Sequence, residues 1–539
     1  MMNTESKKYP QLTFENGIWR GPTKIYRNDD FQVGKRALRS LKEAPKFIGQ
    51  IDSATGKSDT FGDMMNRSVR CSLWLRKKGI GRGDVISIAG ANHVNTVIPI
   101  LAGLYQGCTV NTYPYDWLDE ELISDFVRDL EPKIVFADAV LGPKMMKYSN
   151  IDNKKFQVIV FGDLPGFTSF KDILDEQSAD EVDNFECVDI SSEEDTAFFS
   201  FTSGSSGHPK VFQYPYKLLK RDVHWLPREE LYERVGIWCT EPAWVVVVIS
   251  ALQAILDRST YVIHKYTNAA DFCRVIEKYK INWMMLGTEH VNMISRLSNT
   301  AEFDFSEVTF IRYCGSYIRP EVERNLHTIF PGTWLSQSYG LTEIGIVTYT
   351  MSDHKCPSCG IPAENTEVKL INSKDETVMS PNQSGELCAR TPCLSIAYHK
   401  STTASERTLD SDGWYRTGDL AYYNEDGEFF FVDRIKEMIR YLVADIPAGV
   451  VEDCILKHPA VLEVAVVAKL HDEDIEHPMA FIVKKPYIPV TEQEIEGWVQ
   501  KHLPDRMRLR GGVRFLNNMP YNNAGKIAKG ILRHWCNAE

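Results

Sequence analysis

The stretch from residue 60 to residue 138 changes repeatedly between two hydrophobic periodicities, and this alternation limits the possible folds more than any other feature of the chain. The segments "MMNRSVRCSLWLRKKG" and "TVIPILAGLYQG" have apolar residues at helical spacing, and the short apolar runs "VISIAG" and "TVNTYP" follow them. Another apolar run, "PKIVFAD", comes next. Strands separated by helices predict a parallel sheet. We therefore expect an α/β fold.

Two later apolar runs extend this predicted sheet. The runs "FQVIVFG" and "DTAFFSF" are apolar at consecutive positions, as strands buried on both faces of a parallel sheet are. The second run leads directly into the loop "TSGSSGHPK", which therefore lies at the carboxyl end of a strand. Open α/β sheets bind their ligands at that end of the strands.

This loop gathers small and hydroxyl-bearing residues and ends on a cation: Thr202, Ser203, Gly204, Ser205, Ser206, Gly207 and Lys210. Its backbone N–H groups and hydroxyls can converge on one anion, so the loop predicts a phosphate site. A surface turn rich in Ser and Gly is the alternative. The common P-loop is excluded, because Gly204 and Gly207 are too close together and Pro209 separates His208 from Lys210.

The pattern changes in the second half of the chain. From about residue 365, short runs such as "TEVKLIN" and "GEFFFVD" are divided by turns such as "NEDG", which predicts a β-rich subdomain. After "DRIKEMIR", helix and strand patterns predict a small α+β unit. A chain of 539 residues is too long for one core. We expect an N-terminal domain of α/β subdomains plus a β-rich subdomain over residues 1–433, and a C-terminal domain over residues 434–539.

Charge and hydropathy exclude several kinds of partner. The net charge of −12 argues against a surface for nucleic acids or anionic membranes, which needs a dominant basic patch. The N-terminus has no apolar core of a secretory signal, and the apolar run over residues 244–255 is too short to cross a bilayer. The last residues, "CNAE", lack a Ser-Lys-Leu address. We therefore expect a cytoplasmic protein without a membrane span or a nucleic-acid partner.

Twelve cysteines are scattered along the chain, without the spacing of a disulfide framework. One pair, Cys356 and Cys359 in "KCPSCG", has the spacing of a zinc knuckle. A structural zinc site needs four ligands, and His354 alone leaves this site short. We expect Cys356 and Cys359 to be structural or incidental.

Four further segments follow the phosphate loop in order along the chain: "SQSYGLTEIG", "GELCAR", "DGWYRTGDLAYYNEDGEFFFVDRIKEMI" and "YNNAGKIAKGILR". Together with the loop they resemble the adenylate-forming superfamily, which includes acyl-CoA synthetases, peptide-synthetase adenylation domains and beetle luciferases. The resemblance covers roughly residues 50–535. The stretches "FFFVDRIKEMIRY" and "RLRGGVRFL" are most similar to the insect luciferase and 4-coumarate–CoA-ligase-like branch.

The resemblance implies ATP- and Mg²⁺-dependent activation of a carboxylic acid to an acyl-adenylate, with release of pyrophosphate, followed by thioester formation with CoA. The Ser/Thr/Gly loop and Lys210 would hold the β- and γ-phosphates. Glu343 would reach the magnesium ion and Thr342 the α-phosphate. Asp419 would accept hydrogen bonds from both ribose hydroxyls. The remaining implied nucleotide contacts are Gly315, Ser316, Tyr339 along the adenine, Gly340 and Arg434.

The resemblance also assigns two lysines to the C-terminal domain. Lys526 would bridge the attacking carboxylate and the α-phosphate, and it would also contact the nucleotide. Lys436 would be the hinge about which this mobile domain rotates between two half-reactions. With Thr342 and Glu343, these lysines are the expected catalytic residues. The expected acid pocket, for an aromatic or fatty substrate, contains Trp244, Val245, Gly315 and Tyr317.

One departure from the family pattern concerns the second half-reaction. Acyl-CoA synthetases carry a lysine and then a glycine after the hinge, whereas this chain has Arg440 and Val443 in "IRYLVADIPAGVVE". A valine adds a branched side chain where the family has bare backbone toward the pantetheine tunnel. Three hypotheses therefore stay open: a CoA ligase with an altered tunnel, a luciferase that oxidises its adenylate with O₂, and a non-catalytic nucleotide-binding protein.

Overall fold

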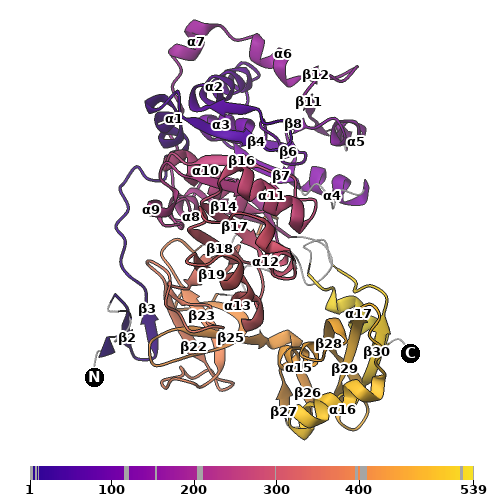
Figure 1. The fold of residues 1–539 in the computed structure, drawn as a ribbon. Helices are drawn as coiled ribbons and strands as arrows, with labels where there is room; N and C mark the ends of the chain where they lie inside the picture. The colour runs from indigo at the N-terminus through magenta and orange to yellow at the C-terminus, as the bar shows by residue number, and fades with distance from the viewer. Residues whose placement is uncertain are drawn as a thin grey trace.

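The computed structural model describes residues 4–5, 9, 11–113, 120–151, 154–202, 210–297, 299–394, 398–400, 409–442, 444–521 and 526–537. It contains two large, mainly parallel sheets, a third antiparallel sheet, and a small C-terminal domain that stands beside them (Figure 1). The expected α/β class, with a β-rich subdomain and an α+β C-terminal domain, is confirmed. Within the described ranges, no helix is long and apolar enough to span a membrane.

The first large sheet has the strand order β12-β11-β8-β6-β7-β13-β14. Its central strands run parallel, as the alternation of helices and strands predicts. All five residues of β6 are buried, which explains the continuous apolar run. Its strands are β6 (Val85–Ala89), β7 (Thr109–Tyr113), β8 (Ile134–Ala137), β11 (Gln157–Val160), β12 (Thr168–Ser169), β13 (Thr196–Thr202) and β14 (Lys210–Pro215).

Helices cover this sheet and connect its strands. The helix α2 begins with a capping box, in which the Thr60 hydroxyl accepts from the Asp63 N–H and the Asp63 carboxylate accepts from the Thr60 N–H. The helix ends at Lys77, and after the cap residue Lys78 the chain reaches Gly79, which takes a left-handed φ of 72°. These helices are α1 (Val33–Glu43), α2 (Phe61–Lys77), α3 (Val97–Gln106), α4 (Glu120–Leu130), α5 (Leu141–Lys147), α6 (Phe170–Asp175) and α7 (Ala179–Asp183). A two-stranded ribbon, β9 (Asn150–Ile151) and β10 (Lys154–Lys155), follows α5.

The second large sheet has nine strands in the order β21-β20-β19-β18-β17-β15-β16-β4-β5. The apolar run over residues 244–255 forms most of α10, and one hydrophobic cluster joins this helix to residues of both large sheets. A helix that is apolar on all sides is buried on all sides, which accounts for the run. The strands are β4 (Ile48–Asp52), β5 (Ser58–Thr60), β15 (Val235–Trp238), β16 (Thr260–Ile263), β17 (Trp283–Gly287), β18 (Phe310–Cys314), β19 (Trp334–Leu341), β20 (Gly345–Tyr349) and β21 (Ile361–Pro362). The helices of this region are α8 (Tyr216–Asp222), α9 (Arg228–Leu231), α10 (Val245–Leu256), α11 (Ala269–Tyr279), α12 (Thr288–Ser295), η1 (Thr300–Glu302) and α13 (Pro320–Ile329).

The third sheet joins the two ends of the N-terminal domain. Trp19 in β3 pairs with Val368 in β22, so a strand from the first residues lies beside one that follows it by more than three hundred positions (Figure 1). Trp19, Tyr423 and Phe429 share its hydrophobic core. The sheet contains β1 (Thr4–Glu5), β2 (Thr13–Glu15), β3 (Ile18–Arg20), β22 (Glu367–Ile371), β23 (Gly385–Arg390), β24 (Tyr415–Tyr423) and β25 (Phe429–Arg434).

The C-terminal domain has a five-stranded sheet of its own and two hydrophobic clusters drawn only from residues after 438. The short helix η2 (Ile435–Glu437) leads into it directly from β25. Its other elements are β26 (Ile439–Tyr441), β27 (Ala444–Ile446), α15 (Ala448–Leu456), β28 (Val461–His471), β29 (Ile475–Lys484), α16 (Glu492–His502), η3 (Asp505–Met507), β30 (Gly512–Leu516) and α17 (Lys529–Asn537). The helix and strand patterns that predict a small α+β unit belong to α15, β28 and α16.

Candidate active site

The structure brings together side chains from four distant segments at the ends of the second and third sheets. Tyr339 and Gly340 lie in β19, and Thr342 and Glu343 form the turn that follows it. Asp419 lies in β24, directly opposite Arg434 in the neighbouring strand β25. Two sheets therefore bring together Tyr339, Gly340, Thr342, Asp419 and Arg434, which the sequence predicts for nucleotide binding.

Asp419 is the most deeply buried carboxylate of this group, with 2% of its surface exposed. The Tyr339 hydroxyl donates to its Oδ2 over 2.7 Å, and Arg434 Nε lies 3.1 Å from its Oδ1 in an ion pair. Among the described residues, Oδ1 accepts no hydrogen bond. Burial raises the pKa of Asp419, while the Arg434 charge and the Tyr339 hydrogen bond oppose that shift. A buried acceptor of this kind fits a ligand that brings its own hydroxyl donors, as ribose does.

Glu343 forms a second polar centre in the turn after β19 and is 7% exposed. The Tyr398 hydroxyl donates to its Oε1, and Lys210 Nζ lies 5.5 Å from the centre of the Tyr398 ring. Burial and the Glu343 charge together raise the pKa of Tyr398 and of Tyr415. Within the described ranges, no cationic side chain forms an ion pair with this carboxylate. Its hard oxygens therefore suit a magnesium ion.

A buried ion pair supports the turn that carries Glu343. Arg221 Nε donates to Asp222 Oδ1 over 2.7 Å, and another Arg221 nitrogen donates to the carbonyl oxygen of Ile344 over 2.5 Å. The Tyr214 hydroxyl donates to the other oxygen of Asp222. A Cβ at Gly345, whose φ is 68°, would lie 1.9 Å from the Arg221 guanidinium. The arginine thus fixes the backbone immediately after Glu343, and the glycine makes room for it.

Three cations surround the Asp419 side of the site. Lys526 comes from the segment before α17, is exposed to solvent, and lies close enough to Arg434, Glu289 and Asp419 for their charges to act on it. Desolvation of its ammonium group by neighbouring residues lowers the pKa of Lys526 although much of the side chain is exposed, and the Arg434 charge lowers it further. Partial burial, followed by the Arg434 charge, also lowers the pKa of Lys436. Crowded cations of this kind favour an anionic ligand.

The end of β18 contributes backbone and hydroxyl groups. Gly315 is exposed, has a φ of 114°, and would place a Cβ no closer than 3.9 Å to Thr288, the nearest neighbour. Ser316 Oγ lies 2.6 Å from the Thr288 hydroxyl oxygen. The Tyr317 hydroxyl reaches Asp453 Oδ2 of α15 over 3.5 Å, so this segment also contacts the C-terminal domain. Its position at the carboxyl end of a parallel strand matches the usual place of ligands.

The remaining predicted residues lie at the ends of the phosphate loop, outside the described residues, or at the start of α10. Thr202 and Lys210 pair across β13 and β14, so the two ends of the phosphate loop are adjacent. Ser203, Gly204, Ser205, Ser206 and Gly207, together with Val443, lie outside the described residues. Trp244 and Val245 begin α10 and pack partly buried against the large hydrophobic cluster, and their assignment to an acid pocket stays a prediction.

One residue of the cysteine pair, Cys359, packs in the same hydrophobic cluster as Tyr339. Cys359 is buried and its Sγ donates to the Phe429 carbonyl oxygen over 3.2 Å, whereas Cys356 is exposed. His354 Nε2 lies 2.8 Å from Glu323 Oε1. The interpretation of Cys356 and Cys359 as structural or incidental stays a prediction.

Sequence reasoning missed the residues that support the site. Tyr398, Glu289 and the Arg221–Asp222 pair carry no local motif, and each acts across a long sequence separation. The one local signal was the adjacent opposite charges of Arg221 and Asp222 at the end of α8, which an exposed helix would show equally well.

Comparison with known proteins agrees with this arrangement. The profile of the AMP-binding enzyme family matches residues 35–399, and that of the AMP-binding enzyme C-terminal domain matches residues 450–526. The chain is 26% identical over 503 residues to 4-coumarate–CoA ligase 4 of Arabidopsis thaliana, which covers 90% of this chain and 87% of the ligase.

Two solved structures show the same fold. The luciferase-like enzyme from the nonluminescent mealworm Zophobas morio is 25% identical, with a TM-score of 0.71, over 77% of this chain and 99% of that one. ATP-bound MatB from Rhodopseudomonas palustris is 16% identical, with a TM-score of 0.83, over 94% of this chain and 98% of that one.

Proposed function

The chain belongs to the AMP-binding enzyme family, and from this premise we propose that it joins a carboxylic acid to AMP and then transfers the acyl group to CoA. In the first step a carboxylate oxygen attacks the α-phosphorus of ATP, the bond to the β-phosphate oxygen breaks, and pyrophosphate leaves. In the second step the CoA sulfur attacks the acyl carbon, and AMP leaves as the thiol loses its proton. The observation that carries the proposal is the buried Asp419, which lies among three cations and whose Oδ1 is ion-paired with Arg434 but accepts no hydrogen bond within the described ranges.

Each group of the site has a task in the first step. Asp419 would accept from the ribose hydroxyls, and Tyr339 would keep its carboxylate oriented. Lys210, Ser316 and Thr342 would bind phosphate oxygens, and Lys526 would neutralise the two anions that must approach each other. Glu343 would hold Mg²⁺, which when bound supplies positive charge to the leaving pyrophosphate.

The second step supports a division of the chain into two domains that move relative to each other. We place these units at residues 1–433 and 434–539, with Lys436 at the hinge in η2. The Tyr317–Asp453 contact joins the units in the present arrangement, where Lys526 lies close to Asp419. A thiol needs access to the same acyl carbon, so Lys526 must leave and another surface of the small domain must take its place.

The CoA ligase hypothesis is favoured over the luciferase hypothesis by the relatives. The relative reported above is a CoA ligase, and the luciferase-like structural neighbour comes from a nonluminescent animal. The non-catalytic hypothesis is disfavoured because Lys210, Glu343, Asp419 and Lys526 are all present.

One experiment separates these hypotheses. The protein is incubated with MgATP, CoA and a panel of aromatic and fatty acids, and pyrophosphate, acyl-CoA and emitted photons are measured together. We expect acid-dependent pyrophosphate release and one thioester per pyrophosphate. Light with O₂ uptake and no thioester would favour a luciferase, and ATP binding without pyrophosphate release would favour a non-catalytic protein.

The same assay tests the effect of Val443. We expect slow thioester formation relative to adenylation, and Val443→Gly is expected to speed the thioester step alone, because glycine removes bulk from the pantetheine route. Rapid thioester formation that the substitution leaves unchanged would mean that the route tolerates valine.

A further inference from the structure

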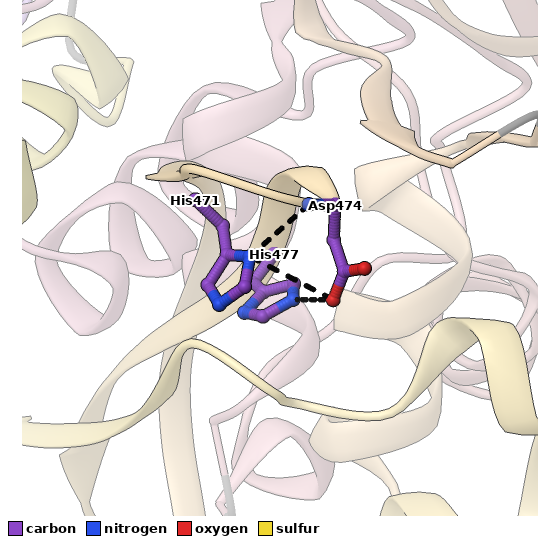
Figure 2. Close-up of side chains that lie close together, drawn as sticks. All are labelled: His471, Asp474 and His477. Atoms are coloured by element: carbon purple, nitrogen blue, oxygen red, sulfur yellow. Dashed lines mark hydrogen bonds and ion pairs between the residues drawn. The ribbon is translucent and has the colours of Figure 1, made fainter.

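The hairpin between β28 and β29 carries three potential metal ligands that take no part in the proposed reaction. His471 ends β28, Asp474 lies in the turn, and His477 is the third residue of β29. The last pair of the ladder joins His471 to Ile475, and side chains two apart in a strand share a face. The strand geometry therefore places both imidazoles on one face of the hairpin, with the aspartate beside them (Figure 2).

The three side chains have the distances of a compact ligand cluster. His477 Nε2 lies 2.8 Å from Asp474 Oδ2, and His471 Nδ1 lies 3.7 Å from the same oxygen. One ligand atom of each residue lies within 4.8 Å of those of the other two. Ligands of a tetrahedral zinc ion are separated by somewhat over 3 Å, about the spacing that zinc–nitrogen and zinc–oxygen bonds of roughly 2 Å produce. The two imidazole rings are stacked with their centres 4.0 Å apart, so rotation of the side chains would have to turn both lone pairs toward one ion.

The hydrogen bonds of the two histidines show which ring atoms lie nearest the turn. His471 Nδ1 accepts from the backbone N–H groups of Asp474 over 3.1 Å and of Glu473 over 3.4 Å, so its lone pair points into the turn. Coordination through Nδ1 would release both N–H groups to water. At His477, the metal would replace the hydrogen bond between Nε2 and Asp474 Oδ2.

The backbone of the turn is strained at the centre of the cluster. Ile475 has a φ of 75°, although it is β-branched and 51% exposed. A left-handed conformation is unfavourable at such a residue, and strain of this kind is concentrated at ligand sites. Burial of Ile475 cannot offset this cost, because half of the side chain faces solvent.

We propose that His471, Asp474 and His477 form a binding site for one divalent ion of the zinc class. Two imidazoles and one carboxylate favour zinc, nickel or copper over magnesium and calcium, which prefer all-oxygen ligands. With three protein ligands, the ion would complete its coordination with water.

A metal at this site would stiffen β26, the strand that follows the proposed hinge. The Leu442 N–H donates to the Asp474 carbonyl oxygen over 3.0 Å, and the Arg440 N–H donates to Glu476 Oε2 over 2.8 Å. The Tyr441 and His477 rings are 5.8 Å apart. A metal that fixes the turn would therefore stiffen β26, which pairs with it.

The test uses the full-length protein after removal of metals with EDTA. Zinc titration by calorimetry is expected to give one site per chain, and Co²⁺ is expected to give the visible absorption of a nitrogen- and oxygen-ligated ion. His471→Ala and His477→Ala each remove one ligand and are expected to weaken zinc binding about tenfold or more, since even outer-shell changes at metal sites cost that much. His502→Ala, an exposed histidine of the same domain outside the cluster, is expected to bind as the wild type does.

Hydrogen exchange provides a second readout that does not depend on activity. Zinc is expected to slow exchange of the Arg440 and Leu442 amides in the wild type and in His502→Ala, but not in His477→Ala. Asp474→Asn serves as the third ligand variant if a histidine variant fails to fold. Zinc binding of equal strength in the wild type and the ligand variants would overturn the proposal, as would stoichiometric zinc that is lost when Cys356 and Cys359 are changed to serine.

Discussion

Asp419 and Lys526 bring opposite charges to one site, but the molecule holds them in different ways. Asp419 lies within a sheet, 2% exposed, between a tyrosine hydroxyl and an arginine. Lys526 lies beside an isolated bridge between Tyr521 and Ile527 and faces solvent. A buried, hydrogen-bonded group suits ligand binding in every state of the enzyme. A group presented by a separate domain suits a single step, for which it can arrive and leave.

The largest expected effect is that of replacing Lys526 on the rate of adenylation. Lys526→Ala is expected to slow adenylation about a hundredfold or more, because it removes charge stabilisation from the transition state. The dissociation constant for ATP is expected to stay within about twofold, since binding relies on the N-terminal domain. Single-turnover pyrophosphate release and calorimetry measure the two quantities, with Lys501→Ala, an exposed lysine of the same domain, as the control.

The next largest effect concerns Asp419. Asp419→Ala is expected to weaken ATP binding about 10- to 100-fold, the amount that hydrogen bonds to a charged group contribute. The proposed division of labour would fail if Asp419→Ala and Lys526→Ala lowered the affinity for ATP equally.

A smaller effect is expected from Arg221, which supports the turn that carries Glu343. Arg221→Lys keeps the charge but cannot bond both Asp222 and the Ile344 carbonyl oxygen, so the Glu343 turn shifts. We expect kcat to fall about tenfold and the half-saturating Mg²⁺ concentration to rise. Arg312→Lys is the matched control, because Arg312 is buried and bonds Trp225 and Ser336 rather than this turn. An unchanged Mg²⁺ requirement in Arg221→Lys would remove Arg221 from a positioning role.

The smallest predicted effect is a shift in pH dependence. Desolvation and the Arg434 charge lower the pKa of Lys526 from its ordinary value of 10.5. The adenylation rate is therefore expected to fall with rising pH already at pH values below 10.5. The loss runs in this direction because the neutral amine cannot stabilise the developing charge. Lys526→Arg keeps a charged group at all accessible pH values, and its residual rate is expected to lack this alkaline decline. The same decline in both proteins would assign it to another group.

The sequence predicted those elements whose pattern is local. The helix-to-strand alternation from α2 to β8 could be read directly, because buried parallel strands are apolar on both faces. The pairing of Trp19 with Val368 could not be predicted from the sequence. A strand of three residues is too short to show a hydrophobic periodicity, and its partner lies far along the chain. The strands β15–β18, which have the same lengths as β6 to β8, were also missed.

The residues of the candidate site also fall into a group that the sequence could identify and a group that it could not. Tyr339, Asp419 and Lys526 belong to short motifs whose residues are adjacent in the sequence, so a resemblance to a family could identify them. Tyr398 and Glu289 reach the site only through the packing of separate segments, and the Arg221 contact to Ile344 spans 123 positions. Periodicity and motifs contain no information on such contacts.

Carboxylate-dependent exchange of labelled pyrophosphate into ATP is the most direct test of whether this protein activates a carboxylic acid. We expect Mg²⁺-dependent exchange with at least one acid for the wild type, and its loss in Lys526→Ala while that variant still binds ATP. A folded wild-type protein that binds ATP but exchanges no pyrophosphate with any acid of a broad panel would contradict the proposed activity, because the residues around Asp419 would then bind a nucleotide without activating an acid.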